Sequence, residues 1–279
     1  RGVVASSAIS KGEWLIRLPS ACVISGELLD SENCSSASSW LQCVAAYYQA
    51  TQTTSNKWRP YLNSLPSLHE YETLLQWTDE QVQNFLAGTT VGELVLADRK
   101  EQFMTNRYRV AVRPFLRKLG LLSTIDTSPD DAVTDEEWNI FLQVCMCIST
   151  RGFHLDNSNL SDKQQGNTSS SGGPFLLPVI DLLNHDPSRK CTTLHRDDAT
   201  GMFCMVAERD IAAGEEVFHS YGDSLTGAQL LQTFGFVPTN TNGNTFPTTP
   251  VVLHKTKHLL AAAESIKKSS IPQAIQNAM

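Results

Sequence analysis

The run LPVIDLLNHD, residues 177–186, passes from apolar side chains into three consecutive polar ones that can donate, accept or ionise. A second run, AGEEVFHSYGD, residues 213–223, has the character of a short strand and ends near a tyrosine and a glycine. Short apolar runs bounded by turn residues are typical of buried strands. We therefore predict that the two runs, both within residues 176–237, meet in space and form the working site.

The composition is that of a globular protein and argues against several classes of function. Of the 279 residues, 41% are apolar and 18% charged, so a sizeable core is expected and wholesale disorder is not. The formal net charge is −7, which argues against a nucleic-acid partner because such proteins need a basic surface to displace counterions from phosphates. No apolar run approaches the roughly 18 residues of a membrane-spanning helix, so no membrane partner is expected.

The seven cysteines are scattered and form no Cys-x-x-Cys pair. An odd number of thiols in a chain of this length fits an intracellular compartment, in which they stay reduced. The triplet Asn184-His185-Asp186 contains metal-ligand types, but neither His195 nor His219 lies at a spacing diagnostic of zinc or iron. We expect no metal site, since a lone histidine is more often a hydrogen-bonded structural residue. The chain begins without a methionine, so we also expect an upstream segment.

The amino-terminal part combines strand, helix and linker patterns. Turn residues between the strand-like segments 1–5 and 14–18 predict a β-hairpin. Apolar residues over 40–48 fall at helical spacing, and Ser39 is the expected cap of that helix. Residues 57–66 contain two prolines and several aromatic anchors, which predicts a linker.

The middle of the chain has helical character. The sequence TDEQ at 78–81 is a helix start of the capping-box type, and TDEE at 134–137 is another, followed by an apolar face. A longer helix is expected over residues 93–119, bent or broken near Pro114 and capped by Gly120.

Strand patterns return in the carboxy-terminal third of the chain. Strands are expected over residues 175–180, 191–195 and 201–207. A short helix is predicted for residues 226–234, with 229–231 as its inner face, and a last helix near 259–266. The stretch 156–173 is rich in Asn, Ser, Gln and Gly, which predicts a surface loop.

Five short motifs occur along the chain. They are RGVVA with KGE (1–5 and 11–13), WRPYL through LP (58–66), TRGF (150–153), DLLNH (181–185), and GEEV through SYG (214–222). Each is weak by itself, but in this order the five resemble the SET-domain protein methyltransferases. The resemblance is closer to the plant Rubisco large-subunit methyltransferase-like class, in which a helical insertion splits the SET fold.

The resemblance implies an α+β protein with a defined division of the chain. A β-rich SET fold with a knot-like crossing would comprise residues 1–66 and 149–238. A helical insertion, 67–148, would interrupt it and shape the substrate's approach, and a short C-terminal helical tail, 239–279, would follow. Because relatives usually continue into a larger helical lobe, we expect weaker affinity for a protein substrate or a chain that extends beyond its last residue.

The resemblance also implies a cofactor, S-adenosylmethionine, and residues to hold it. Arg151 would pair with the cofactor's carboxylate, a task suited to a planar forked cation. Gly2 would lie along the cofactor, where the absence of a side chain allows close backbone approach. The cofactor-binding positions that the resemblance implies are Arg1, Gly2, Arg151, Asn184, His185 and Phe234.

The implied reaction is methyl transfer to a lysine of a protein partner, and Tyr221 takes the position of the family's catalytic tyrosine, which orients the methyl group and the amine. A lysine, whose pKa is about 10.4 in water, must lose its proton first, and an apolar channel lowers that pKa. Substrate-facing positions fall on Phe153, Asp181 and Ser220. Phe153, in place of a polar residue, favours lysine over histidine as the acceptor. We expect a monomer.

Alternative interpretations accompany each residue and the whole chain. Tyr221 could end a buried strand, Arg151 could form a surface ion pair, and Asn184-His185 could form a turn. The competing functions are a histidine methyltransferase of the same class and a non-catalytic SET module that binds protein. Every matched catalytic position holds the expected residue type, which favours an enzyme. Ser220 stands where many relatives carry a larger side chain, so the number of methyl groups added, like the substrate and the compartment (cytoplasm, nucleus or plastid), stays open.

Overall fold

The computed structural model describes residues 2–53, 57–71, 73–100, 107–122, 133–155 and 172–237. Its contacts divide the chain into two compact units, each described here by itself. The first unit contains Arg1–Leu65 and Val112–Asp223, and the second contains Pro66–Ala111 and Ser224–Met279. Arg1, most of the predicted loop at 156–173 and the predicted helix near 259–266 lie outside the described residues.

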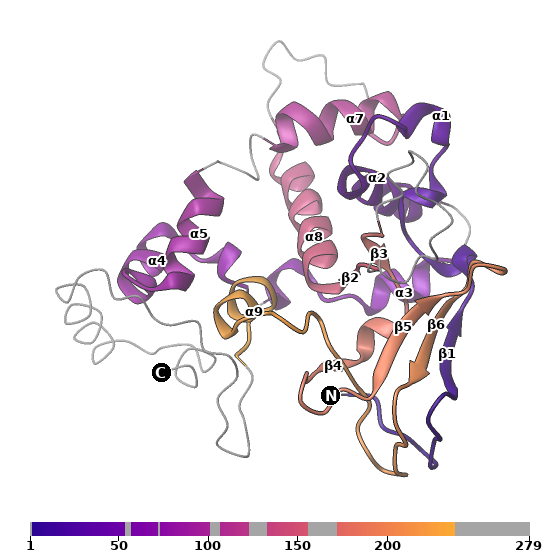
Figure 1. The fold of residues 1–279 in the computed structure, drawn as a ribbon. Helices are drawn as coiled ribbons and strands as arrows, with labels where there is room; N and C mark the ends of the chain where they lie inside the picture. Colours follow the sequence, from indigo (N-terminus) through magenta and orange to yellow (C-terminus); the bar gives the residue numbers. More distant parts are fainter. Residues whose placement is uncertain are drawn as a thin grey trace. The chain divides into compact units, whose positions relative to one another are not determined.

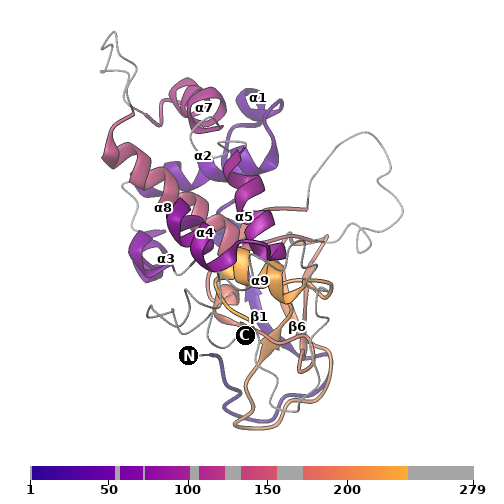
Figure 2. The same cartoon turned by 90° about the vertical axis from the view of Figure 1, so that its left-hand side faces the viewer.

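A three-stranded antiparallel sheet in the order β1-β6-β5 anchors the first unit. Its strands are β1 (Trp14–Leu18), β5 (Thr192–Arg196) and β6 (Phe203–Ala207). Figures 1 and 2 both show β1, from the amino-terminal end of the chain, lying beside β6. Side chains from all three strands enter one core, in which Phe203 and Met205 of β6 are fully buried. Strand β6 is therefore the central strand of the sheet and contributes its most buried side chains.

The predicted amino-terminal hairpin is wrong. β1 pairs with β6, while Val4 bridges to Glu216 and Ile9 to Ile211. Both amino-terminal segments therefore find antiparallel partners about two hundred residues away in sequence instead of each other. A local turn signal cannot exclude such a partner, because strand pairing depends on the whole sheet.

Two short strand pairs carry the segments that the motifs single out. Antiparallel strands β2 (Gly152–Phe153) and β3 (Phe175–Leu176) form one pair, and parallel strands β4 (Asn184–His185) and β7 (Phe218–His219) form the other. In the second pair Asn184 lies opposite Phe218 and His185 opposite His219. The prediction that the two sequence runs meet in space is confirmed. The strand expected over 175–180 ends at Leu176 and gives way to a single 3₁₀ turn, Ile180–Leu182.

The first unit also contains helices. They are α1 (Ser31–Cys34), α2 (Ser39–Gln52), α3 (Arg59–Ser64), α7 (Arg113–Lys118) and α8 (Asp135–Arg151). Of these, α8 packs against β2 and α2 packs against α8. The cap of α2 is Ser38, one residue before the predicted one, and its hydroxyl accepts a hydrogen bond from the Leu41 amide at 3.3 Å. The linker predicted at 57–66 contains α3, which the proline in its first turn favours because that position needs no amide hydrogen.

Helix α8 begins as its capping pattern predicts. The hydroxyl of Thr134 accepts a hydrogen bond from the Glu137 amide at 3.1 Å, and three acidic residues in the first turn complement the helix dipole. Glu137 also forms a bidentate ion pair with Arg113 at the start of α7, with distances of 2.8 and 3.2 Å. This pair ties α8 to α7. Within the long helix predicted over 93–119, a π-helical segment, Tyr108–Val112, leads directly into α7, so the described backbone changes its hydrogen-bond pattern just before Pro114 but is not broken there. Residues 101–106 of that predicted helix lie outside the described part of the chain.

The second unit is helical in its described part. Its helices are α4 (Asp79–Leu86), α5 (Thr90–Lys100) and α9 (Gly227–Phe234). Capping boxes at Thr78 and Thr226 start α4 and α9. Leu86, Val95 and Leu231 belong to its core. Leu230 and Leu231 are buried as predicted, whereas Gln229 is exposed and completes the capping box.

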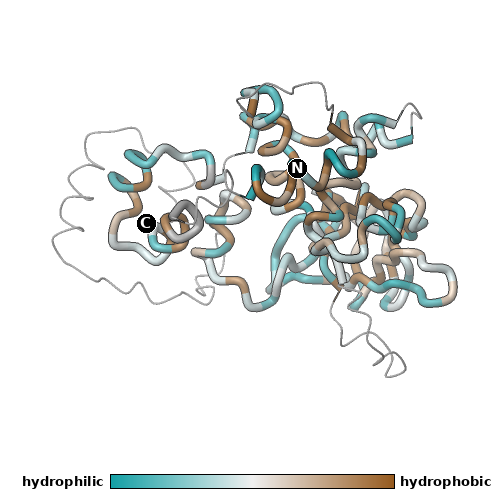
Figure 3. The backbone as a smooth tube through the Cα atoms, turned by 90° about the horizontal axis from the view of Figure 1, so that it is seen from above, coloured by the Kyte–Doolittle hydropathy of each residue, from teal (hydrophilic) through white to brown (hydrophobic). Residues whose placement is uncertain are grey.

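The hydropathy-coloured trace shows apolar and polar residues alternating along the helical turns (Figure 3), as expected of helices that bury one stripe. Within the described ranges, no helix is long and apolar enough to cross a membrane.

Val179, which precedes the 3₁₀ turn at Ile180–Leu182, has an unusual backbone. Its φ is 73° and its ψ is −43°, a region that β-branched residues rarely adopt. The side chain is 53% exposed, so packing compensates little for this conformation. The turn that carries Asp181 is therefore held in place by contacts elsewhere.

Replacing Val179 by glycine removes strain of about 1–3 kcal/mol, against about 0.5–1 kcal/mol of added chain entropy. We expect the free energy of unfolding of Val179→Gly, measured by chemical denaturation, to stay level or to rise by up to about 2.5 kcal/mol. The matched control is Val4→Gly, because Val4 is 56% exposed but lies in an extended bridge. The free energy of unfolding of Val4→Gly should fall by about 1 kcal/mol. A larger fall for Val179→Gly than for Val4→Gly would contradict the inference that Val179 is strained.

Candidate active site

Asp181 is a buried carboxylate with two donors on one oxygen. Tyr61 Oη donates to Asp181 Oδ2 at 3.0 Å, and Arg151 Nη1 donates to the same oxygen at 3.1 Å. Arg151 Nη1 also lies 3.3 Å from the Asp181 carbonyl oxygen. Only 2% of the Asp181 side chain is exposed. Segments from α3, from the end of α8 and from the turn before β4 therefore meet at this group.

Burial and the neighbouring donors have opposite effects on the pKa of Asp181. Burial raises the pKa of Asp181, while the Arg151 guanidinium and the Tyr61 hydroxyl act to lower it. Burial also raises the pKa of Tyr61, and the neighbouring Asp181 charge raises it further. Tyr61 thus stays a neutral donor, and removal of either donor would leave a buried carboxylate with a lost partner.

Asn184, Glu216 and Gly2 form a second polar cluster. Asn184 Nδ2 donates to Glu216 Oε1 at 2.7 Å. A Cβ placed on Gly2 would lie 2.1 Å from that same Glu216 oxygen and 2.8 Å from Asn184 Nδ2. A side chain at position 2 would therefore displace the pair, so this position requires glycine for close approach and not for an unusual φ.

His185 and Tyr221 are joined through the backbone and the rings. The Tyr221 amide donates to His185 Nδ1 at 3.0 Å, and the ring centroids lie 5.1 Å apart. Tyr221 Oη donates to the Leu183 carbonyl oxygen at 3.0 Å. Because Nδ1 accepts, His185 is neutral with its proton on Nε2. Burial lowers the pKa of His185 and raises that of Tyr221, so both groups are held in their neutral forms.

His219 is a half-buried histidine beside Phe153. Their ring centroids lie 5.8 Å apart, with 32° between the ring planes. Nδ1 of His219 is buried and has no hydrogen-bond partner among the described residues. Burial lowers the pKa of His219 to about 4, although its hydrogen bond with the Thr192 backbone acts in the opposite direction. At neutral pH the ring is therefore an uncharged acceptor.

The predicted site residues are only partly joined by described contacts. Gly2, Arg151, Asp181, Asn184, His185 and Tyr221 belong to the clusters above. Ser220 Oγ accepts from the Gly222 amide at 3.3 Å, and a hydrogen bond with Ser220 lowers the pKa of Asp223. Phe234 belongs to the second unit, where its ring lies 6.2 Å from that of Phe236. The functional roles of all these residues stay predictions.

Three polar residues at these clusters were not singled out from the sequence as site residues. Tyr61 and Glu216 lie inside the motifs WRPYL and GEEV, and His219 lies two residues before the tyrosine. For Tyr61 and Glu216, their place inside a motif was the sequence signal that could have marked them as site residues. The partners of all three residues are 27 to 120 residues away, so the contacts themselves could not be read from spacing.

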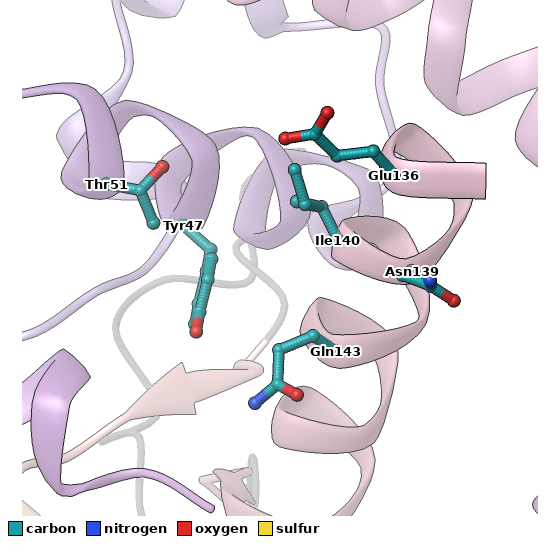
Figure 4. A pocket seen from close by; sticks show the side chains of 6 residues that line it. All are labelled: Tyr47, Thr51, Glu136, Asn139, Ile140 and Gln143. Atoms are coloured by element: carbon teal, nitrogen blue, oxygen red, sulfur yellow. The ribbon is translucent and has the colours of Figure 1, made fainter. Parts of the chain in front are cut away.

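A hollow of about 570 Å³ lies between α2 and α8. In Figure 4 the side chains of Tyr47 and Gln143 point into the space between the two helices. The lining residues are Tyr47, Thr51, Glu136, Asn139, Ile140 and Gln143, none of which is a predicted site residue. In the described part of the chain, no three His, Cys, Asp or Glu side chains are grouped so that they could hold a metal ion.

A family model described as the SET domain matches residues 1–222. The chain belongs to the SET-domain family. Among the curated relatives of this SET-domain chain, the N-lysine methyltransferase SETD6 of Homo sapiens is 26% identical over 253 residues, which cover 86% of this chain and 49% of that protein. That of Xenopus laevis is 26% identical over 256 residues, which cover 86% and 52%. The chain thus spans about half the length of these relatives.

Solved structures share the SET fold. The SET domain of LSMT bound to lysine and AdoHcy matches with a TM-score of 0.61 and 17% identity, over 85% of this chain and 50% of that one. Rubisco LSMT bound to sinefungin and monomethyllysine matches with a TM-score of 0.60 and 20% identity, over 86% and 50%. The predicted resemblance and the predicted α+β SET fold are confirmed.

The pKa of His219 predicts how stability depends on pH. Because the folded pKa of about 4 lies below the ordinary 6.5, the unfolded chain binds the proton more readily. The contribution of His219 to stability is therefore complete above about pH 6.5 and is lost as the pH falls toward 4, by roughly 2 kcal/mol at pH 4.5.

We expect His219→Gln to flatten this dependence when unfolding by urea is measured between pH 7 and pH 4.5. The control is His195→Gln on β5, since His195 is exposed. An identical pH dependence in the His219→Gln variant and the parent protein would contradict the assignment.

Proposed function

We propose that this SET-domain protein is an S-adenosylmethionine-dependent protein-lysine N-methyltransferase. The observation that carries the proposal is the setting of Tyr221, whose amide is held by His185 and whose hydroxyl is held by the Leu183 carbonyl. The names of the curated relatives support lysine as the acceptor, and solved neighbours hold lysine or methyllysine with AdoHcy or sinefungin. The cofactor supplies a methyl group made electrophilic by its sulfonium.

The residues present fit such a cofactor. Gly2 leaves space beside Asn184 and Glu216 that a Cβ would fill. Asn184 and Glu216 supply polar groups for a cationic ligand, and Arg151 supplies a guanidinium suited to a carboxylate. Arg151 pairs with Asp181 in this structure, so a cofactor carboxylate would share its guanidinium with Asp181. Arg1, His185 and Phe234 complete the proposed cofactor-binding set.

Tyr221 orients the acceptor in this proposal and does not deprotonate it. Burial raises the pKa of Tyr221, so the hydroxyl keeps its proton at neutral pH. That proton is directed to the Leu183 carbonyl at 3.0 Å, and the lone pairs of the oxygen remain to accept from an amine. A neutral lysine amine donates to such an oxygen and keeps its own lone pair for the methyl group.

Phe153, with His219 beside it, provides an aromatic surface for the aliphatic part of a lysine. Its apolar ring disfavours the ammonium form and so favours loss of the lysine proton before transfer. Asp181 and Ser220 complete the proposed substrate-facing set.

The wider organisation is part of the proposal. We assign residues 1–66 and 149–238 to the two parts of the SET domain, 67–148 to a helical insertion and 239–279 to the C-terminal helical tail. The partner is a protein that presents a lysine, the enzyme acts as a monomer, and its compartment is intracellular.

The direct test is transfer of labelled methyl groups from S-adenosylmethionine to proteins of a cell extract, with the product mapped by mass spectrometry. We expect methyllysine. Methylhistidine as the sole product would replace lysine by histidine as the acceptor. Absence of cofactor binding in calorimetry by a well-folded sample would favour the non-catalytic module.

Tyr221→Phe removes the orienting hydroxyl and keeps the ring. We expect cofactor affinity to change less than about twofold, while methyl transfer falls at least about 100-fold. The control is Tyr47→Phe, which removes a hydroxyl from the hollow between α2 and α8 and should keep full transfer. Unchanged turnover of Tyr221→Phe would refute the role of the hydroxyl.

A further inference from the structure

Glu216 lies where three segments of the first unit meet. Val4 bridges to Glu216 in antiparallel fashion, and the Val217 amide donates to the Val3 carbonyl at 2.8 Å. On the other side, β7 begins at Phe218 and pairs with β4. The backbone at Glu216 is thereby held on both sides, and its carboxylate reaches Asn184 Nδ2 at 2.7 Å.

The Glu216–Asn184 contact determines which way the Asn184 amide faces. An ionised carboxylate only accepts hydrogen bonds, and the amide nitrogen is the donor end of asparagine. Asn184 must therefore turn its NH₂ group toward Glu216. Its Oδ1, on the other branch of the planar amide, is directed away from Glu216 as an acceptor.

We propose that Glu216 is a positioning residue for cofactor binding, which orients Asn184 so that Oδ1 accepts from the ammonium group of the cofactor's amino-acid end. This inference rests on the proposed function. It assigns the two ends of that moiety opposite partners: an acceptor at Asn184 for the ammonium group and a guanidinium at Arg151 for the carboxylate. A carboxylate next to Asn184 also polarises the amide and strengthens Oδ1 as an acceptor.

Gly2 contributes to the same arrangement of Glu216 and Asn184. A Cβ at position 2 would lie 2.1 Å from Glu216 Oε1, so it would push the carboxylate away from Asn184. Gly2→Ala therefore disturbs the orientation of the Asn184 amide by displacing the Glu216 carboxylate, without removing a polar group.

The test compares two ligands by calorimetry. S-adenosylhomocysteine carries the ammonium and carboxylate groups, and 5′-methylthioadenosine lacks both. In Glu216→Gln, whose amide can present either end to Asn184, affinity for S-adenosylhomocysteine should fall about tenfold. Affinity for methylthioadenosine should change less than about twofold. Gly2→Ala should show the same selective loss, which keeps the test available if Glu216→Gln folds poorly.

The matched control is Glu215→Gln, the same change one residue earlier. Glu215 pairs with Arg209 at 2.7 Å and accepts from the Ala212 amide, so it has no part in the Asn184 contact. Both affinities should stay at the parent values in this variant. Equal weakening of both ligands by Glu216→Gln, or no weakening, would overturn the inference.

A double-mutant cycle separates positioning from direct attraction. If Glu216 acts through Asn184, Glu216→Gln in an Asn184→Ala background should change S-adenosylhomocysteine affinity less than about twofold. A remaining tenfold loss would mean that the carboxylate attracts the ligand directly, and positioning would be refuted. A parent protein that binds neither ligand would overturn the proposed function as well, whereas normal binding and transfer with an unaffected Glu216→Gln would overturn only the positioning role.

Discussion

The parallel pairing of β4 with β7 is the constraint on which the candidate site depends. It is two residues long, but the Asp186 amide extends it by donating to the His219 carbonyl at 3.1 Å. Residues 3–5 pair with 215–217, the residues immediately before β7, so the backbone is hydrogen-bonded to a neighbour both before β7 and within it. The side chains that act together are therefore mounted on backbone whose hydrogen bonds are satisfied.

The polar groups of the site depend on one another because they are buried or half-buried. One carboxylate oxygen of Asp181 accepts hydrogen bonds from Tyr61 and Arg151, and Asn184 donates to Glu216. Burial makes an unpaired polar group costly, so each partner restricts the orientation of the next. Burial also keeps Tyr221 and His185 neutral, which suits a site that orients a nucleophile. The energetic cost and the chemical use of this site thus have the same origin.

Local patterns were accurate where the interaction that decides the structure is itself local. Thr78, Thr134 and Thr226 each cap a helix through an amide three residues ahead, and that distance is visible in the sequence. The hairpin prediction was wrong because strand pairing is not a local interaction. Segments 1–5 and 14–18 carry strand patterns, but neither segment contains information about which distant strand completes its hydrogen bonds.

The sequence by itself determined the class of fold, the starts of the main helices and the polar runs at 181–186 and 219–223. The helix starts follow from spacing and capping, which are properties of neighbouring residues, whereas the class of fold follows from a family resemblance that the order of five motifs carries. Only the tertiary structure decided that Tyr61 donates to Asp181, that Asn184 donates to Glu216 and that His219 lies beside Phe153. Each of these contacts joins residues at least 32 positions apart, and the pairing of distant segments depends on how the whole core packs.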